Sequence, residues 1–189
     1  MRGKLLIFGG SGLVGSRFIE LNRVNFQISA PDLNNVDIQD IEAVRRTVEE
    51  FGPQSVVNFA AYTNVQEAQK QKDDKEGLCY RLNANGAKNV AQACNQRGVY
   101  LVHISTDYVF NGRKANAPYT EEDKPDPINW YGQTKYFGEQ LVMESSGQAV
   151  IVRISMPFSA SYKLKKDVAR FFLEELRAGR KIEAIEDQA

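Results

Sequence analysis

The sequence has very little histidine and cysteine. Its 189 residues include one histidine, His103, and two cysteines, Cys79 and Cys94. The single histidine lies inside the apolar run "YLVHIS". A Ser-His-Asp or Cys-His catalytic site would have to use this histidine, and a zinc site would lack companion ligands. Two cysteines in one predicted helix indicate neither a disulfide framework nor a metal site. We therefore expect a packed or hydrogen-bonded strand histidine, two reduced and partly buried thiols, and no metal.

Long apolar runs and an excess of charge of one sign are also missing. The longest apolar stretches are short segments such as "LLIF" and "SVVNFAAY", which cannot cross a membrane as a helix. Lys plus Arg and Asp plus Glu number 24 each, so we expect neither a nucleic-acid partner nor a polybasic membrane patch. The start "MRGKLLIFGG" passes from charge into a strand pattern and then glycines, without the longer apolar segment of a secretory signal. These features predict a cytoplasmic protein.

The sequence does contain a regular alternation of short apolar runs, rich in β-branched residues, with longer amphipathic stretches. The runs predict strands at 4–10, 26–30, 55–61, 99–105, 149–155 and 181–187. The stretches predict helices at 12–23, 40–52, 73–98, 129–145 and 165–179. Nearly continuous apolar strands alternating with helices are typical of a parallel sheet covered on both faces. With right-handed crossovers they predict a doubly wound α/β sheet, a Rossmann fold, as one domain over residues 1–189.

A glycine-rich segment, "IFGGSGLVGS", follows the first predicted strand and opens the first predicted helix. Gly9, Gly12 and Gly15 are spaced three apart in it, and Leu13 and Val14 begin the helix. Glycines in a strand–turn–helix context permit a tight turn and a close approach of the backbone to a pyrophosphate, which the helix N-terminus then favours electrostatically. This segment predicts a dinucleotide site, and a glycine-rich turn without a ligand is the structural alternative.

Asp32 follows the second predicted strand, seventeen residues after the last glycine of the loop. A carboxylate near that offset commonly holds the adenosine ribose hydroxyls of a dinucleotide, although a turn aspartate beside Pro31 explains it equally well. Leu33, and not an arginine, comes next, which favours NAD over NADP. Asp37 and Ile38 are candidates for flanking the adenine.

The stretch "INWYGQTKYFGE" places Tyr131 and Lys135 four residues apart in a predicted helix. Residues at that spacing lie on one face of a helix, one turn apart. A lysine ammonium close to a phenol favours the phenolate, and so brings the phenol pKa towards the range in which it exchanges a proton readily. Tyr162 and Lys166 repeat the spacing in "YKLKK". Spacing by itself therefore does not separate an active pair from two residues on a solvated face.

Six segments, taken together, resemble a known family in order and spacing: "FGGSGLVGS", "VVNFAAYTNV", "LNANGAKNVAQAC", "HISTDYVFNG", "PYTEEDKPDPINWYGQTKYFGE" and "VIVRIS". They are similar to the extended short-chain dehydrogenase/reductases, and within these to the dTDP-4-dehydrorhamnose reductase branch, over nearly the whole chain. The resemblance implies a catalytic trio of Thr106, Tyr131 and Lys135, and it selects Tyr131 over Tyr162. Thr106 is then a hydroxyl donor to the substrate carbonyl, Tyr131 the proton donor, and Lys135 its tuner and a ribose ligand.

The resemblance also implies cofactor contacts outside the glycine loop, by Ala60, Ala61, Tyr62, Asn83, Tyr131 and Lys135. It implies substrate contacts by Thr106, Asp107, Tyr131 and Ser155. Two of these residues have plain structural alternatives. Asn83 could bond only backbone groups, and Ser155 could simply cap the end of its strand.

The activity implied by the resemblance is NAD(P)H-dependent reduction of a 4-keto nucleotide-sugar, with dTDP-4-dehydro-L-rhamnose as the expected substrate and dTDP-L-rhamnose as the product. The cofactor is then NADPH or NADH. Met156 stands where many of these reductases have a tryptophan, so one side of the sugar pocket is expected to differ. Some members form a metal-linked dimer, but the helix carboxylate involved falls at Arg17, which leaves a homodimer without a metal.

Two further expectations follow from the same resemblance. The chain stops at "IEDQA", where the family continues into a smaller C-terminal substrate domain, so we expect that domain to be missing from this chain. The regulatory β subunit of methionine adenosyltransferase resembles the same branch and keeps the tyrosine–lysine spacing. A non-catalytic, dinucleotide-binding regulatory subunit is therefore the alternative function. A sugar-nucleotide epimerase or dehydratase is the weaker third reading, because only Asp107, followed by Tyr108, stands where dehydratases have an acidic pair.

Overall fold

The computed structural model describes residues 2–114, 117–159, 162 and 167–182, and they contain a five-stranded sheet in the order β2-β1-β3-β4-β5. Every neighbouring pair of strands is parallel, which confirms the predicted doubly wound sheet. The elements in chain order are β1 (Gly3–Phe8), α1 (Leu13–Asn22), β2 (Phe26–Ser29), α2 (Ile41–Phe51), β3 (Ser55–Asn58), α3 (Val65–Gln69), α4 (Leu78–Tyr80), η1 (Arg81–Gly86), α5 (Ala87–Gln96), β4 (Tyr100–Thr106), η2 (Asp107–Val109), α6 (Trp130–Ser145), β5 (Ala149–Ile154) and α7 (Val168–Arg177).

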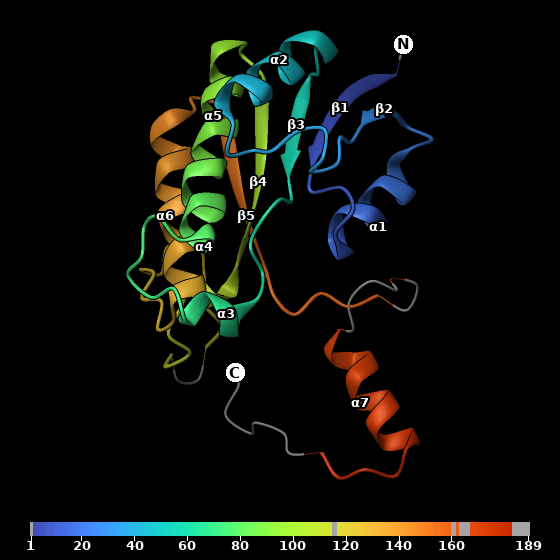
Figure 1. Ribbon diagram of the computed structural model, residues 1–189, viewed down its shortest axis with the longest axis vertical. Helices are drawn as coiled ribbons and strands as arrows, with labels where there is room; N and C mark the ends of the chain where they lie inside the picture. The colour runs from blue at the N-terminus through green and yellow to red at the C-terminus, as the bar shows by residue number, and fades with distance from the viewer. Residues whose placement is uncertain (1, 115–116, 160–161, 163–166, 183–189) are drawn as a thin grey trace.

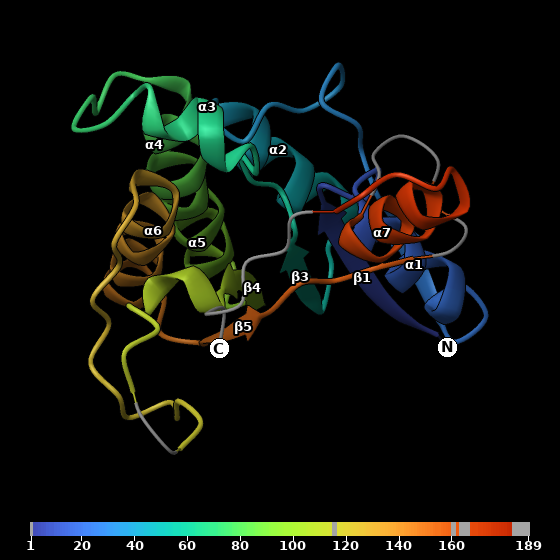
Figure 2. The same cartoon turned by 90° about the horizontal axis from the view of Figure 1, so that it is seen from below.

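Helices α2, α5 and α6 cover one face of the sheet, and α1 lies on the other face (Figures 1 and 2). The main core fills the space between the sheet and helices α2, α5 and α6. Its buried side chains include Leu6, Phe8, Val44, Val48, Val56, Val90, Leu101 and Val142. Burial of these side chains supplies the main driving force for the fold. Among the described residues, no helix combines the length and apolar character that a membrane span requires.

The carboxyl ends of the strands lie at the lower edge of the sheet in Figure 1. The chain leaves β1 towards β2 on one side and later returns to place β3 on the other side, with Phe8 opposite Asn58 in register. A doubly wound sheet opens a crevice at such a reversal, outside the carboxyl ends of the strands. The fold therefore positions the loops after β1 and β3 at the place where a ligand is expected.

Some predicted elements differ from the structure. The long helix predicted from residue 73 begins only at Leu78. Asp73 has a left-handed φ of 64°, which is incompatible with a helix that starts at that residue. The same helix contains a π-helical segment, η1, and the short helix α3 was not predicted. The segment between the predicted strand at 99–105 and the predicted helix at 129–145 opens with the 3₁₀ helix η2. The predicted strand at 181–187 lies almost wholly outside the described residues, and 181–182 are not in a strand.

Two glycines bring α6 unusually close to its neighbours. A Cβ on Gly132 would lie 2.2 Å from the carbonyl oxygen of Tyr108, and a Cβ on Gly138 would lie 2.1 Å from the carbonyl oxygen of Asn83. Backbone groups cannot move aside as a flexible side chain can. The contact of α6 with η2 and η1 therefore depends on the absence of side chains at these two positions.

We expect Gly138→Ala to lower the free energy of unfolding by about 1–3 kcal/mol, because the added methyl group forces α6 away from η1. Gly147→Ala is the matched control, since a Cβ there would meet nothing closer than Asn95 Oδ1 at 3.7 Å. That variant should change stability by no more than about 0.5 kcal/mol. Urea denaturation measures the free energy of unfolding of both variants. Equal stability of the two variants would contradict close packing at Gly138.

Candidate functional site

The glycine loop is folded tightly on itself and on the segment that follows β3. Gly9 has a φ of 73°, and a Cβ there would lie 2.4 Å from the amide nitrogen of Ala60. A Cβ on Gly15 would lie 2.5 Å from the carbonyl oxygen of Gly9. Gly12 differs, because its Cβ would meet only that same carbonyl oxygen, at 3.3 Å. Packing within the protein thus requires glycine at 9 and 15, whereas Gly12 leaves open space that a side chain would fill.

Helix α1 begins at this open space without a side-chain cap. Gly12 is its N-cap residue, and the first helical hydrogen bond runs from Ser16 N to Gly12 O over 2.9 Å. The first N–H groups of a helix, here those around Leu13 and Val14, have no partners within the helix, and the helix dipole adds a partial positive charge. An uncapped N-terminus beside a vacant glycine position fits the pyrophosphate of a dinucleotide.

Tyr162 also contacts the glycine loop, a contact that the sequence analysis did not foresee. Its hydroxyl donates to the carbonyl oxygen of Ser11 over 3.1 Å. The chain after β5 crosses below the carboxyl ends of the sheet towards α1 in both views (Figures 1 and 2), which carries this tyrosine to the loop. No local pattern signals a contact between residues 151 positions apart.

The residues predicted to hold the adenosine end lie after β2. Asp32 is exposed, and its Oδ1 accepts from Asn35 N over 3.1 Å, so it does form a turn while its other oxygen remains at the surface. The Asp37 carboxylate accepts from Gln39 N over 2.9 Å. Ile38 is only 3% exposed and its side chain packs against Gly86, so its side chain belongs to the core.

The segment after β3 is held by one buried amide, that of Asn83 in η1. Asn83 Oδ1 accepts from Tyr62 N over 2.8 Å, and Asn83 Nδ2 donates to Tyr62 O over 3.1 Å and to Thr134 Oγ over 3.0 Å. The amide therefore ties the Ala60–Ala61–Tyr62 segment to α6. Asn83 thus bonds a side chain as well as backbone groups, so its contacts go beyond the backbone-only alternative named above. A π-helical segment in this position is common at functional sites.

Thr106, Tyr131 and Lys135 are brought together at the carboxyl edge of the sheet. Thr106 ends β4, Tyr131 lies in the first turn of α6, and Lys135 lies one turn later. Thr106 lies close enough to Tyr131 to influence the pKa of its phenol. Lys135 is 2% exposed, and its Nζ donates to the carbonyl oxygen of Ile104 over 2.7 Å. The helix is started by Asn129, whose side chain accepts from Gly132 N over 2.8 Å.

Burial dominates the electrostatics of this group. It raises the pKa of Tyr131 to about 12, against an opposing effect of Thr106. It lowers the pKa of Lys135 to about 8, against the opposing charges of Glu139 and Cys79. Lys135 directs its Nζ to a strand carbonyl. Its expected effect on the pKa of Tyr131 stays a prediction.

Cys79 and Cys94 are both free and fully buried, so the thiols are reduced as predicted but more deeply buried than expected. Cys79 lies beside the same site, with its Sγ 3.3 Å from Thr134 Oγ, and burial raises the pKa of its thiol. Among the described residues, no group of three or more His, Cys, Asp or Glu side chains is arranged to hold a metal ion.

A cleft of about 1220 Å³ opens at the carboxyl ends of β4 and β5, and its lining does not include Tyr131. Its lining includes Asp107, Tyr108, Phe110, Tyr119, Arg153 and Ser155. The predicted substrate residues Asp107 and Ser155 thus face one cavity, and they contact each other, because Ser155 Oγ donates to Asp107 Oδ2 over 2.6 Å. An ion pair braces this side of the cleft. Arg153 on β5 donates to both carboxylate oxygens of Glu139 on α6, over 3.0 and 2.6 Å.

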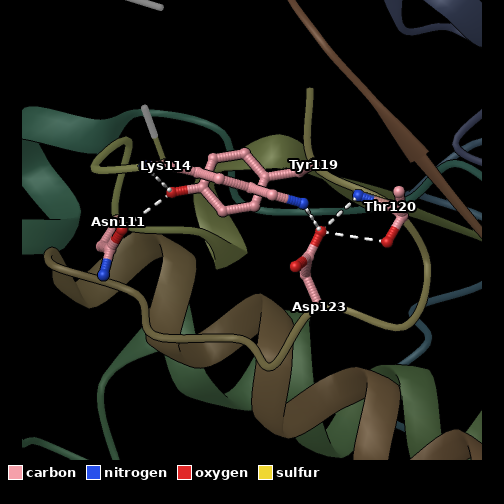
Figure 3. A network of polar contacts seen from close by, with 5 residues as sticks. All are labelled: Asn111, Lys114, Tyr119, Thr120 and Asp123. Carbon is pink, nitrogen blue, oxygen red and sulfur yellow. Dashed lines mark hydrogen bonds and ion pairs between the residues drawn. The ribbon is translucent and has the colours of Figure 1, made fainter. Parts of the chain in front are cut away.

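The outer wall of the cleft is a loop stabilised by its own polar contacts (Figure 3). Lys114 Nζ donates to Asp123 Oδ2 over 2.6 Å, and Thr120 donates to the same oxygen through its N–H and its hydroxyl. The Lys114 ammonium is the main cause that lowers the pKa of Asp123 to about 2. Tyr119 donates to Asn111 Oδ1 over 2.8 Å. These contacts join residues 111–114 to residues 119–123.

His103 lies on β4 and is fully buried, as predicted. Asn58 Oδ1 accepts from Ala60 N, which orients the amide so that its Nδ2 donates to His103 Nδ1 over 3.2 Å. The ring proton must then be on Nε2, which has no protein partner. Burial, with a smaller contribution from the Lys135 charge, lowers the pKa of His103 well below its ordinary value. The single histidine is a neutral structural group.

A parallel doubly wound sheet, a glycine loop at an uncapped helix, and a partly buried tyrosine one turn from a buried lysine on α6 define the Rossmann-type short-chain dehydrogenase/reductase class. More specifically, residues 3–189 match the RmlD substrate binding domain, and the chain belongs to that family.

Named relatives fall into two groups. The chain is 32% identical over 186 residues to methionine adenosyltransferase 2 subunit beta of Rattus norvegicus, covering 94% of this chain and 54% of that protein. It is 37% identical over 145 residues to dTDP-4-keto-6-deoxy-D-glucose reductase of Streptomyces niveus, covering 76% and 49%. The crystal structure of dTDP-4-dehydrorhamnose reductase from Bacillus anthracis str. Ames in complex with NADP superimposes with a TM-score of 0.85 at 37% identity, covering 94% and 61%. The chain thus spans about half the length of the curated relatives it matches.

We expect His103 to give a neutral Nε2–H signal in ¹H–¹⁵N spectra at pH values well below 6.5, the ordinary value for the side chain. A depressed pKa in the folded state means that the unfolded chain binds more protons. The contribution of His103 to stability is therefore present above about pH 6.5 and is lost as the pH falls towards the folded-state pKa. Urea titrations at about pH 7.5 and about pH 5.5 should show this loss. The loss should be smaller in His103→Gln, which does not titrate, and a midpoint near 6.5 in the spectra would contradict the prediction.

Proposed function

We propose that this chain is the dinucleotide-binding part of an NAD(P)H-dependent oxidoreductase that reduces the 4-keto group of a nucleotide-sugar, with dTDP-4-dehydro-L-rhamnose as substrate and dTDP-L-rhamnose as product. The observation that carries the proposal is the conjunction of two sites at one edge of the sheet. The open glycine loop at α1 lies at the end of β1, and the group Thr106, Tyr131 and Lys135 lies at the ends of β4 and α6. The names of the reductase relatives support the substrate class.

In this proposal, the residues of the crevice bind and orient the dinucleotide. The N–H groups at the start of α1 bind the pyrophosphate, and Gly12 leaves the room for it. The free oxygen of Asp32 accepts from the adenosine ribose, and the segment Ala60–Tyr62, held by Asn83, lies under the nicotinamide end. The bound dinucleotide supplies the hydride. Asp32 favours NADH, because its carboxylate disfavours a 2′-phosphate. The structure of the Bacillus anthracis relative is a complex with NADP, which supports NADPH as the other candidate.

The chain's own chemistry in the reaction is proton donation. Negative charge develops on the keto oxygen during reduction, and the phenol of Tyr131, which is protonated at neutral pH, donates to it. The Lys135 ammonium lies one helical turn away, where it leaves the Ile104 carbonyl to bind the nicotinamide ribose. Asp107 and Ser155 line the cleft that takes the sugar. A cytoplasmic location and a homodimer stay predictions from the sequence.

A regulatory subunit is the second candidate function. It is favoured by the 32% identity to methionine adenosyltransferase 2 subunit beta, which extends over 94% of this chain. A phenol with a pKa near 12 and a lysine engaged by a strand carbonyl are also compatible with a site that binds a dinucleotide without turnover. The partner would then be the catalytic subunit of such an enzyme.

We expect Gly12→Val to abolish detectable binding of NAD(P)H without unfolding the protein. The Cβ position at Gly12 meets one protein atom at 3.3 Å, so the fold can accommodate a side chain while the pyrophosphate cannot. Calorimetric titration with NADH and with NADPH measures the binding, and circular dichroism verifies the fold. Gly147→Val is the control for the change of residue type. A folded Gly12→Val protein with unchanged affinity for both dinucleotides would exclude the loop as the binding site.

We expect Tyr131→Phe to lower kcat for NAD(P)H oxidation with a dTDP-4-keto-6-deoxyhexose by about 10²–10⁴-fold, the usual contribution of a general acid. The measurement requires a protein that includes the rest of the family's length. Dinucleotide affinity should stay nearly unchanged in Tyr131→Phe, whereas Lys135→Ala should weaken both turnover and binding. Tyr100→Phe, at an exposed position on the opposite end of β4, is the matched control.

Two outcomes separate the candidate functions. Equal turnover by wild type and Tyr131→Phe would remove Tyr131 from the mechanism. Dinucleotide binding by the intact wild-type protein, with no turnover of any nucleotide-linked keto sugar, would instead support the regulatory subunit.

A further inference from the structure

The peptide unit between Ser11 and Gly12 is held by hydrogen bonds on both of its sides. Its N–H, which belongs to Gly12, donates to the carbonyl oxygen of Gly9 over 3.1 Å. Its carbonyl oxygen, which belongs to Ser11, accepts from the hydroxyl of Tyr162 over 3.1 Å. A trans peptide directs these two groups to opposite sides. The first bond therefore joins the unit to the glycine loop, and the second joins it to the chain after β5, directly before the first turn of α1.

The residues that flank Tyr162 along the chain are held by one carboxylate, that of Asp167. Its Oδ2 accepts from Ser159 N over 3.1 Å, and its Oδ1 accepts from Arg170 N over 2.9 Å, which caps the start of α7. Asp167 is only 8% exposed. In both views α7 lies towards α1 and away from α6 (Figures 1 and 2). The bond from Tyr162 thus connects the glycine loop to a part of the chain that is anchored at residue 167.

The carbonyl of Ser11 is a group that a bound dinucleotide would take out of water. Ser11 is exposed, so water reaches its carbonyl in the free protein. A pyrophosphate at the first N–H groups of α1 covers this turn. A carbonyl that loses its water without gaining a partner costs free energy, and its partial negative charge repels an anion. The Tyr162 hydroxyl has one proton, and it gives that proton to Ser11, so this carbonyl keeps a partner when the water leaves.

We propose that Tyr162 is a positioning residue of the dinucleotide site. It fixes the Ser11–Gly12 peptide in front of α1, and it keeps the Ser11 carbonyl paired when the ligand covers the loop. The inference rests on the proposed function for the identity of the ligand, a dinucleotide. It assigns a task to the tyrosine of the second tyrosine–lysine pair, which spacing by itself did not separate from the first. That task is at the pyrophosphate and not at the reacting atoms.

The contact itself is tested without a ligand, through the ¹³C signal of the Ser11 carbonyl. Cell-free synthesis with ¹³C-carbonyl serine and ¹⁵N-glycine selects Ser–Gly peptides, and this chain has two, Ser11–Gly12 and Ser146–Gly147. In Tyr162→Phe we expect the first signal to move, because the partner of the carbonyl changes from a fixed phenol to exchanging water. The second signal is the internal control and should stay in place. An unmoved first signal would overturn the inference.

Dinucleotide binding is the second measurement. Calorimetric titration should give dissociation constants for NADH and NADPH about threefold to tenfold higher in Tyr162→Phe, the usual effect of one neutral hydrogen bond. The affinity for adenosine, measured by displacement of NADH, should stay the same, because adenosine has no phosphate to cover the loop. Tyr100→Phe is the matched control. It removes a hydroxyl from an exposed tyrosine at the opposite end of β4, and it should change none of these affinities.

A merely structural role of Tyr162 would give a different result. Water replaces the hydroxyl at the exposed Ser11 carbonyl of the free protein, so Tyr162→Phe should keep the wild-type midpoint of thermal unfolding without a ligand. A ligand that binds the folded state raises this midpoint, and at one NADH concentration the rise should be smaller in Tyr162→Phe. Lower stability without NADH, together with a rise equal to that of the wild type, would overturn the inference.

Binding and turnover together separate this inference from the proposed function. Weaker dinucleotide binding by Tyr162→Phe, in a protein that reduces no keto sugar, would support the inference and count against the reductase. In an active protein of the family's full length, Tyr162→Phe should raise KM for NAD(P)H and leave kcat nearly unchanged. Unchanged or tighter dinucleotide binding by Tyr162→Phe would overturn the inference, and so would a wild-type protein that binds no dinucleotide.

Discussion

The close approach of α6 to η1 and η2 is the constraint on which the rest of the site depends. Gly132 and Gly138 allow backbone contacts that any side chain would prevent. Because α6 lies so near the end of β4, the phenol of Tyr131 reaches Thr106 and the ammonium of Lys135 reaches the carbonyl of Ile104. The same contact lets Thr134 accept from Asn83, so the helix also determines where the segment after β3 lies.

This close packing has an electrostatic consequence. Groups on α6 that ordinarily face water are held in the interior, and each must find a partner there. Lys135 uses a strand carbonyl, and Glu139 uses the guanidinium of Arg153. Arg153 in turn lies over the ring of Phe110, 5.0 Å from its centroid, and Phe110 stacks on Tyr119 at 4.3 Å. Contacts therefore run without interruption from the helix core to the wall of the cleft.

The two parts of the site, the glycine loop and the side chains on α6 and at the end of β4, depend on different kinds of group. The glycine loop offers open space and uncapped N–H groups, so a ligand there would meet backbone and the position of an absent side chain. The other part consists of side chains whose protonation is governed mainly by burial. They meet at one edge because parallel strands place all their carboxyl ends together. A ligand that touches both must therefore lie along that edge.

The sequence by itself determined the parallel sheet, the glycine loop and the tyrosine–lysine pair, since each is encoded by local periodicity or by short spacing. The resemblance added Thr106, Asp107, Asn83 and Ser155, which no local pattern marks. Only the tertiary structure decided what these residues do. The amide of Asn83 holds Tyr62, Lys135 bonds a strand carbonyl, and Tyr162 reaches the glycine loop. These outcomes depend on desolvation and on contacts between distant segments, and both arise only when the chain is folded.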